Sequence, residues 1–141
     1  MAQAREGPTG AAADVVDDYD AICRVLQLYT EGEAKGDVGK LRQAFHADAR
    51  MFGSIAGERE DVPIEELLAE AQSKPGDTGS YRSRVLSVQQ TGDAAVGVVA
   101  AEGYWGTMSF ISYFLLARIE GDWKIVCKLY AHTAGEPPEG V

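Results

Sequence analysis

The sequence predicts a single α+β domain, in which three N-terminal helices pack on one face of a curved antiparallel sheet. Three observations support this class. Apolar residues recur at helical spacing in the first half of the chain, alternate as in strands in the second half, and are separated there by short turns. Consecutive strands joined by tight turns form an antiparallel meander, so the helices that precede them must cover one of its faces.

The composition is that of one globular domain with an acidic balance. The chain has 141 residues, of which 45% are hydrophobic and 25% charged, and its formal net charge is −9. This charge argues against a nucleic-acid partner and against an anionic membrane surface. No apolar run approaches the ~20 residues that span a bilayer, so a cytoplasmic protein without a membrane partner is expected.

The two cysteines, Cys23 and Cys127, lie in apolar segments and are expected to be reduced and buried. No CxxC pair or Cys/His cluster has the spacing of metal ligands, and no phosphate-binding loop is present. Neither a metal nor an organic cofactor is therefore expected.

The domain is predicted to span residues 14–133, between a flexible arm at 1–13 and a flexible tail at 134–141. An amphipathic stripe predicts the first helix from residue 15 to 35; its members are Tyr19, Ile22, Val25, Leu26 and Tyr29. Gly36 suits the end of this helix.

Two further helices have clear start signals. Asp37 is placed to cap a short second helix over residues 38–45. Pro63 opens the third helix, which carries Ile64, Leu67, Leu68 and Ala71 on one face.

The strands follow from the change to extended periodicity. A short strand is expected at residues 50–52 and a loop at 53–61, and longer strands at 81–90 and 94–104. A final hairpin is expected over residues 107–133.

The final hairpin has two different faces. A type I turn with a bulge at Gly121 would pair Ile119 with Trp123, Leu115 with Cys127 and Tyr113 with Leu129. Alternation would then turn one face toward the core; it carries Tyr113, Trp123, Ile125, Cys127 and Leu129. The other face is apolar with a basic fringe and is expected to form a homodimer interface through Phe114, Leu116, Val126 and Tyr130. The alternative is a monomer with scattered apolar surface residues.

Two segments resemble the nuclear transport factor 2-like (NTF2-like) superfamily, and within it the group described as putative lumazine-binding or polyketide-cyclase-like. They are YTEGEAKGDVGKLRQAFHADARMFG near the first helix and FISYFLLARIEGDWKIVCKLYAHT at the end. The resemblance covers about residues 15 to 133. It implies a cone-shaped sheet wrapped around the helices, in a cystatin-like α+β barrel, with a pocket at its open end and a dimer formed by sheet packing. Its members include isomerases, dehydratases, epoxide hydrolases, polyketide cyclases and binding domains.

The resemblance transfers only some catalytic residues. Tyr29 matches the tyrosine that donates to the oxyanion in the ketosteroid isomerase relatives. The position of their general base falls at Gly53, and the position of their protonated acid falls near Phe114 and Leu115. The aspartate of the dehydratase relatives falls near Ala34.

Four residues are candidates for acid–base catalysis. His46 and Asp48 lie two apart, so the carboxylate could orient the imidazole, although a capping histidine and a turn aspartate would give the same pattern. Tyr29 could donate to a substrate oxygen or only pack. Glu102 would be the best base if it pointed inward, and an ordinary surface charge if it pointed outward.

The substrate-binding candidates are mainly apolar or aromatic: Phe52, Tyr104, Trp105, Tyr113, Cys127 and Leu129. Tyr104 and Trp105 could form a stacking platform at the rim of the pocket. His132 is expected to be a surface residue. These residues predict a small-molecule-binding protein, and the enzyme types expected of it are a cofactor-independent isomerase, dehydratase or cyclase that acts on a small apolar or aromatic ligand. The alternative is a non-catalytic ligand-binding or dimerisation domain.

Overall fold

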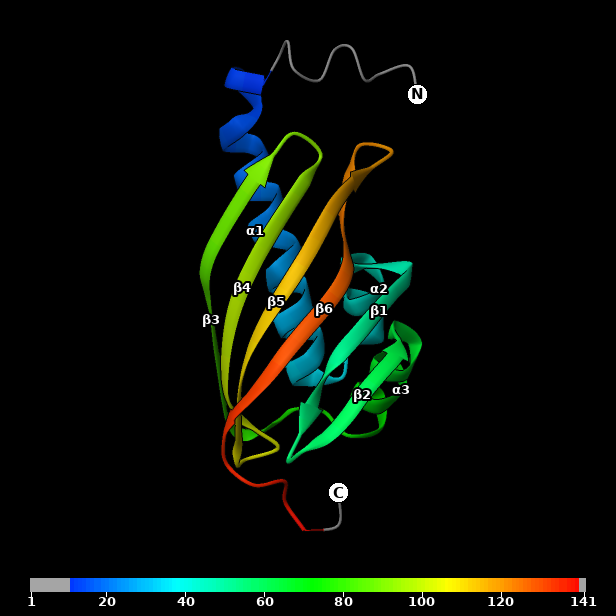
Figure 1. The fold of residues 1–141 in the computed structure, drawn as a ribbon, viewed down its shortest axis with the longest axis vertical. Coiled ribbons are helices and arrows are strands. Elements are labelled where there is room, and N and C mark those ends of the chain that lie inside the picture. The colour runs from blue at the N-terminus through cyan, green and yellow to red at the C-terminus, as the bar shows by residue number, and fades with distance from the viewer. Residues whose placement is uncertain (1–10, 140–141) are drawn as a thin grey trace.

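The computed structural model describes residues 11–139 and shows a sheet curved around helices (Figure 1). Within this range the elements are α1 (Ala11–Lys35), α2 (Val38–Ala44), β1 (Phe45–Ile55), β2 (Glu58–Pro63), α3 (Ile64–Ser73), β3 (Asp77–Thr91), β4 (Ala94–Tyr104), β5 (Met108–Ile119) and β6 (Asp122–Ala134). The predicted α+β class is confirmed. Most of the expected N-terminal arm, residues 1–10, lies outside the described residues, and residues 11–13 belong to α1.

The sheet has six strands in the order β2-β1-β6-β5-β4-β3. All neighbouring strands are antiparallel except β1 and β6, which run parallel. The meander predicted for the second half of the chain therefore continues at one edge into the β1–β2 hairpin (Figure 1).

The β1–β2 hairpin corrects the loop that was predicted at residues 53–61. Ala56 and Gly57 both have positive φ angles, 51° and 86°, as a two-residue type I′ turn requires. The segment Glu58–Pro63 was not predicted as a strand because most of its residues are charged. An edge strand with an exposed face tolerates such charges, whereas a central strand does not.

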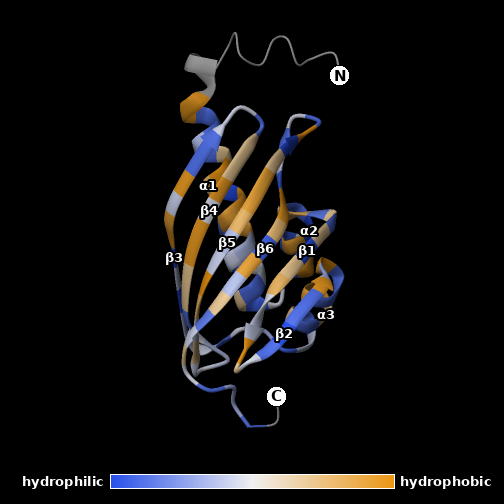
Figure 2. Cartoon of the chain, viewed as in Figure 1, coloured by the Kyte–Doolittle hydropathy of each residue, from blue (hydrophilic) through white to orange (hydrophobic). Residues whose placement is uncertain are grey.

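The core lies between the helices and the concave face of the sheet. Ile22 and Leu26 of α1 are fully buried, and the apolar face predicted for α3 is buried as well. Asp37 accepts a hydrogen bond from the backbone N–H of Lys40 at 3.2 Å, which confirms the predicted cap of α2. The strand β4, next to the edge strand β3, is hydrophobic along most of its length (Figure 2).

The β5–β6 hairpin differs from the prediction close to its turn. Glu120 and Gly121 have φ angles of 53° and 89° and form a two-residue turn, so Ile119 pairs with Asp122 instead of Trp123. A bulge at Val126 then shifts the register by one residue, between the pairs Leu116–Ile125 and Leu115–Cys127. Farther from the turn, the predicted pairs Leu115–Cys127 and Tyr113–Leu129 are confirmed.

The bulge reverses which side chains of β6 face inward. Trp123 and Ile125 are buried as predicted, but beyond Val126 the inward residues are Lys128 and Tyr130. The prediction that Tyr113, Cys127 and Leu129 face the core is wrong, because Tyr113 and Leu129 are exposed and Cys127 is half-buried on the other side of the strand.

The residues predicted for the dimer interface are also corrected, because the two-residue turn brings Leu116 opposite Ile125 on the inner face of β5 and the bulge turns Tyr130 inward on β6. Phe114, Leu116 and Tyr130 are buried in the core of the domain, and Val126 lies half-buried at the bulge. They cannot form an outer face. The homodimer itself stays a prediction.

Candidate functional site

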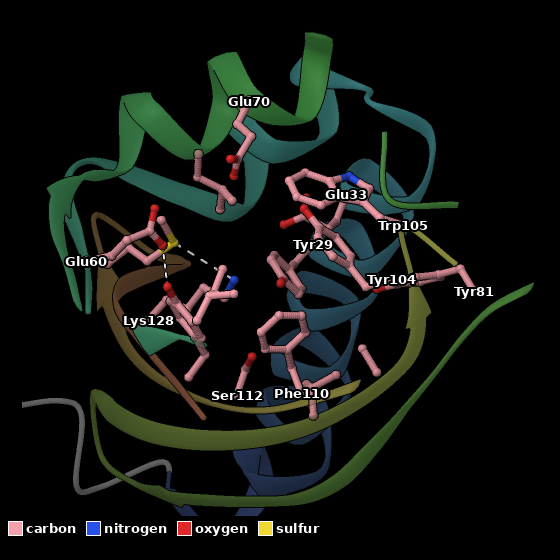
Figure 3. Close-up of a pocket in the computed structure, with 16 residues that line it drawn as sticks. Tyr29, Glu33, Glu60, Glu70, Tyr81, Tyr104, Trp105, Phe110, Ser112 and Lys128 are labelled. Carbon is pink, nitrogen blue, oxygen red and sulfur yellow. Dashed lines mark hydrogen bonds between the residues drawn. The ribbon is translucent and has the colours of Figure 1, made fainter. Parts of the chain in front are cut away.

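A cavity occupies the end of the domain at which α3, the C-terminal part of α1 and the strongly curved part of the sheet meet (Figure 3). The empty space among its lining side chains, with the open mouth included, is ≈ 530 Å³. The cavity itself measures ≈ 40 Å³, which is enough for a few waters, so a larger ligand must also occupy the mouth or displace side chains.

Glu33 is the most deeply buried carboxylate of the cavity. Its exposed fraction is 2%, and its Oε1 accepts a hydrogen bond from the Tyr104 hydroxyl at 3.1 Å. Burial raises the pKa of Glu33, while the charge of Lys128 and the hydroxyls of Tyr104 and Tyr29 oppose this rise. A carboxyl group with such a pKa can exchange protons nearer to neutral pH than an exposed one.

Lys128 lies across the cavity from Glu33 (Figure 3). Its exposed fraction is 7%, and its Nζ lies 5.1 Å from the ring centroids of both Tyr29 and Tyr130. The Met51 sulfur is 4.0 Å from Nζ. Burial lowers the pKa of Lys128, and the nearby carboxylates Glu33, Glu60 and Glu70 act in the opposite direction.

Two further carboxylates give the cavity a negative balance. Glu60 accepts a hydrogen bond from Tyr130, and Glu70 points into the cavity from α3 (Figure 3). Partial burial and the neighbouring carboxylates raise the pKa of Glu70. With Glu33, three carboxyl groups face one amine, so the cavity favours neutral ligands over anionic ones.

Aromatic rings form the opposite wall. The Tyr104 and Trp105 rings lie 4.9 Å apart at an angle of 31°, and Phe110 meets Tyr104 edge to face at 5.6 Å. Trp105 Nε1 donates to the Lys74 carbonyl at 2.9 Å, which fixes the indole. The platform predicted from Tyr104 and Trp105 therefore lies in the cavity wall.

Tyr81 is the only residue of the described part of the chain with a buried side-chain polar atom, its hydroxyl, that lacks a hydrogen-bond partner. Its side chain also lines the cavity. A buried hydroxyl without a partner is unfavourable, so a ligand oxygen is a suitable acceptor for it.

Three of the predicted site residues line the cavity: Tyr29, Tyr104 and Trp105. The others lie elsewhere. Four predicted binding residues are absent from the lining; these are Phe52, Tyr113, Cys127 and Leu129. Phe52 is displaced because its neighbour Met51 takes the inward position on β1.

The predicted acid–base pair and the predicted base are also outside the cavity lining. The His46 ring accepts a hydrogen bond from the Asp48 backbone N–H at 3.0 Å, so it contacts the main chain and not the carboxylate. Glu102 is exposed, and its Oε1 lies 3.7 Å from Nη1 of Arg82. It is therefore the ordinary surface charge that was the alternative prediction. His132, which was predicted at the surface, is half-buried near the end of β6, and its ring accepts a hydrogen bond from the Ala56 backbone N–H at 3.1 Å.

Sequence reasoning missed Glu33 and Lys128. Glu33 follows Tyr29 by four residues and thus continues the buried stripe of α1, a signal that was available. The resemblance placed the aspartate of the dehydratase relatives near Ala34, the residue that follows Glu33. Gly53 has no room for the base of the isomerase relatives, since a Cβ there would lie 2.5 Å from the Tyr130 ring.

The raised pKa of Glu33 predicts a pH-dependent stability. The folded protein binds the proton of Glu33 more tightly than the unfolded chain does. The contribution of Glu33 to stability is therefore lost as the pH rises from 4.5, the ordinary pKa of a glutamate, through the higher pKa in the folded protein. Glu33→Gln removes this loss. The free energy of unfolding of the variant, minus that of the wild type, should therefore increase with pH.

Urea unfolding between pH 4 and 8 measures this difference. Glu102→Gln is the matched control, since its exposed side chain should give a nearly constant difference. A Glu33→Gln difference that stays flat or decreases with pH would contradict the burial of a titrating Glu33.

Two general findings concern the described residues as a whole. Residues 11–139 contain no group of three or more His, Cys, Asp or Glu side chains that could hold a metal ion. No helix in the same range has the length and apolar character needed to cross a membrane.

Comparison with known proteins gives a consistent family and fold. Residues 17–131 match the model of a family described as putative lumazine-binding. A protein named aldolase FrzH, from Cladobotryum sp, is 22% identical over 113 residues, which cover 80% of this chain and 90% of that protein.

Two solved structures show the same fold. An NTF2-like protein from Methylobacillus flagellatus KT superimposes with a TM-score of 0.77 at 32% identity, over 84% of this chain and 94% of its own. A ketosteroid isomerase-like protein from Erwinia carotovora atroseptica gives a TM-score of 0.65 at 18% identity, over 82% and 95% of the two chains.

Proposed function

The chain belongs to the putative lumazine-binding family of the NTF2-like superfamily, and from this premise we propose that its cavity binds a small neutral carbonyl compound and catalyses proton transfer on it. The observation that carries the proposal is the buried Glu33 carboxylate, held by the Tyr104 hydroxyl in the wall of a cavity with aromatic sides. A buried carboxyl group at a cavity is a candidate catalytic acid or base.

Each part of the reaction has a candidate group. Glu33 accepts the proton from the carbon next to the carbonyl, and Tyr104 positions Glu33 for this step. The Tyr81 hydroxyl donates to the oxygen on which negative charge develops. The rings of Tyr104 and Trp105 contact the apolar or aromatic body of the ligand.

The aldolase relative supports this reaction class. Aldol chemistry begins with removal of a proton beside a carbonyl, which is the step assigned to Glu33. Isomerisation, dehydration and cyclisation of carbonyl compounds use the same step, so the proposal covers the reaction types expected from the sequence.

Ligand binding can be tested with cyclohexanone, benzaldehyde and 4-hydroxyacetophenone, followed by tryptophan fluorescence. Binding should change the emission of Trp105 in a saturable way, and Trp105→Phe should abolish most of the change. Sodium benzoate, which has a similar size but a negative charge, is the matched probe and should bind more weakly. Saturable binding of benzoate, without binding of the three neutral carbonyl compounds, would overturn the proposed ligand class.

A further inference from the structure

The Lys128 amine has an environment unlike that of a structural ion pair. Its Nζ is surrounded by the faces of Tyr29 and Tyr130 and by the Met51 sulfur. Within residues 11–139, no carboxylate oxygen lies within 4 Å of it. A buried amine without a close anion is costly to keep protonated, so its placement needs another explanation.

The other lysines are placed differently. Lys35 and Lys40 lie at the surface, where they pair with Asp77 and Glu31. Lys74 is half-buried and its Nζ lies 4.7 Å from the centroid of the Trp105 ring, but Lys74 is not part of the cavity lining. Lys124, on the same strand as Lys128, donates from Nζ to the Gln43 carbonyl at 2.8 Å. Lys128 is therefore the lysine whose amine combines burial, a cavity and apolar neighbours.

An amine in such surroundings is suited to nucleophilic attack. Burial lowers the pKa of Lys128 and so increases the fraction of neutral amine near pH 7. Desolvated lysines of this kind are the ones that form Schiff bases with carbonyl substrates.

We propose that Lys128 is a covalent binding site, where the amine condenses with the carbonyl carbon of the ligand to form an imine. This inference rests on the proposed function for the class of ligand. It adds a nucleophile to the carboxyl groups already described.

The condensation balances without an oxidant or reductant. The nitrogen lone pair forms a bond to the carbonyl carbon, and the π electrons of the C=O bond move to oxygen, which takes a proton from a carboxyl group of the cavity. The nitrogen, which now carries a positive charge, gives one of its protons to a carboxylate of the cavity and so regains a lone pair. A second proton transfer to the oxygen lets it leave as water, while this lone pair forms the C=N bond, so that one proton is consumed overall. The products are one protonated imine and one water, and addition of water reverses the step.

The cavity provides acids and bases for each transfer. Glu33 and Glu70 both have raised pKa values and can give or take a proton. The cationic nitrogen then faces three carboxyl groups, which stabilise it. The protonated imine makes the neighbouring C–H more acidic, and Glu33 is the group placed to remove that proton.

Reductive trapping tests the inference. Wild-type protein is incubated at pH 7 with cyclohexanone or benzaldehyde and sodium cyanoborohydride, and the modified lysine is identified by intact mass and peptide mapping. We expect one added group per chain, located on Lys128, at least tenfold faster than on any other lysine.

The controls separate the amine from its charge and from general surface reactivity. Lys128→Arg keeps a cation but cannot form the imine, so labelling should disappear. Lys124→Arg should leave it unchanged. Because the mapping is done on the wild-type chain, the result does not depend on whether the Lys128 variant folds.

The outcomes distinguish this inference from the proposed function. If Lys128 is labelled no faster than the surface lysines, the inference is overturned. If Trp105 fluorescence still reports saturable ketone binding in that case, the proposed ligand class stands without the covalent step. If fluorescence shows no binding either, the covalent site at Lys128 and the proposed ligand class are both overturned.

Discussion

Glu33→Gln is expected to slow exchange of the α-protons of cyclohexanone into D₂O by about 10²–10⁴-fold, the range by which one acid–base group accelerates a reaction. Glutamine retains the size of the side chain and can still accept a hydrogen bond from Tyr104, but it cannot take a proton from carbon. Proton NMR of cyclohexanone, with and without the protein, measures the exchange directly and requires no knowledge of the natural substrate.

Two variants complete this experiment. Glu102→Gln changes a carboxylate outside the cavity and should retain the wild-type rate. Tyr104→Phe removes the hydroxyl that holds Glu33, so its effect should be smaller than that of Glu33→Gln and should alter the pH profile of the rate. A folded Glu33→Gln protein that exchanges protons as fast as the wild type would exclude Glu33 as the base. Ketone binding without any acceleration by the wild-type protein would favour the non-catalytic alternative.

Phe114→Ala should destabilise the fold by about 3–5 kcal/mol, the usual cost of removing a large buried ring. Phe114 has an exposed fraction of 0% and its ring lies 4.6 Å from that of Tyr29. Its neighbour Tyr113 points to the other face and is 47% exposed, so Tyr113→Ala should cost less than about 1 kcal/mol. Urea unfolding of the two variants measures the contrast.

This pair of substitutions tests which face of β5 is internal. The assignment made from alternation alone predicts the opposite order of effects, with Tyr113 in the core. A larger loss of stability for Tyr113→Ala than for Phe114→Ala would therefore contradict the placement of the strand.

The helices and the antiparallel meander of β3 to β6 could be predicted because each has a local signal. In the stripe of α1, Ile22, Val25, Leu26 and Tyr29 are buried as predicted but Tyr19 is exposed, and the Asp37 cap is confirmed. Pro63 occupies the N-cap of α3, so the helix begins one residue later than predicted. The strand β2 could not be predicted, because its charged residues satisfy an edge position that only the assembled sheet defines.

The candidate site was less predictable for a physical reason. Its aromatic residues Tyr29, Tyr104 and Trp105 follow from hydrophobic patterns, and these do line the cavity. Lys128 also lines the cavity, but the pattern does not predict it, since a regular alternation starting from Trp123 assigns Lys128 to the outer face. Only the unpaired residue in the ladder moves it inward, and no residue type near Val126 marks that irregularity.

The bulge at Val126 also affects how relatives should be aligned. On its two sides β6 follows opposite alternations, so the presence of the bulge decides which set of side chains lines the cavity wall. Loss of Val126 would leave a regular strand in which Lys128 and Tyr130 still face inward, whereas a strand of the same length without the bulge would turn Cys127 and Leu129 inward. A relative that is one residue shorter here should therefore be aligned with its gap at Val126, so that the residues lining the two cavities correspond.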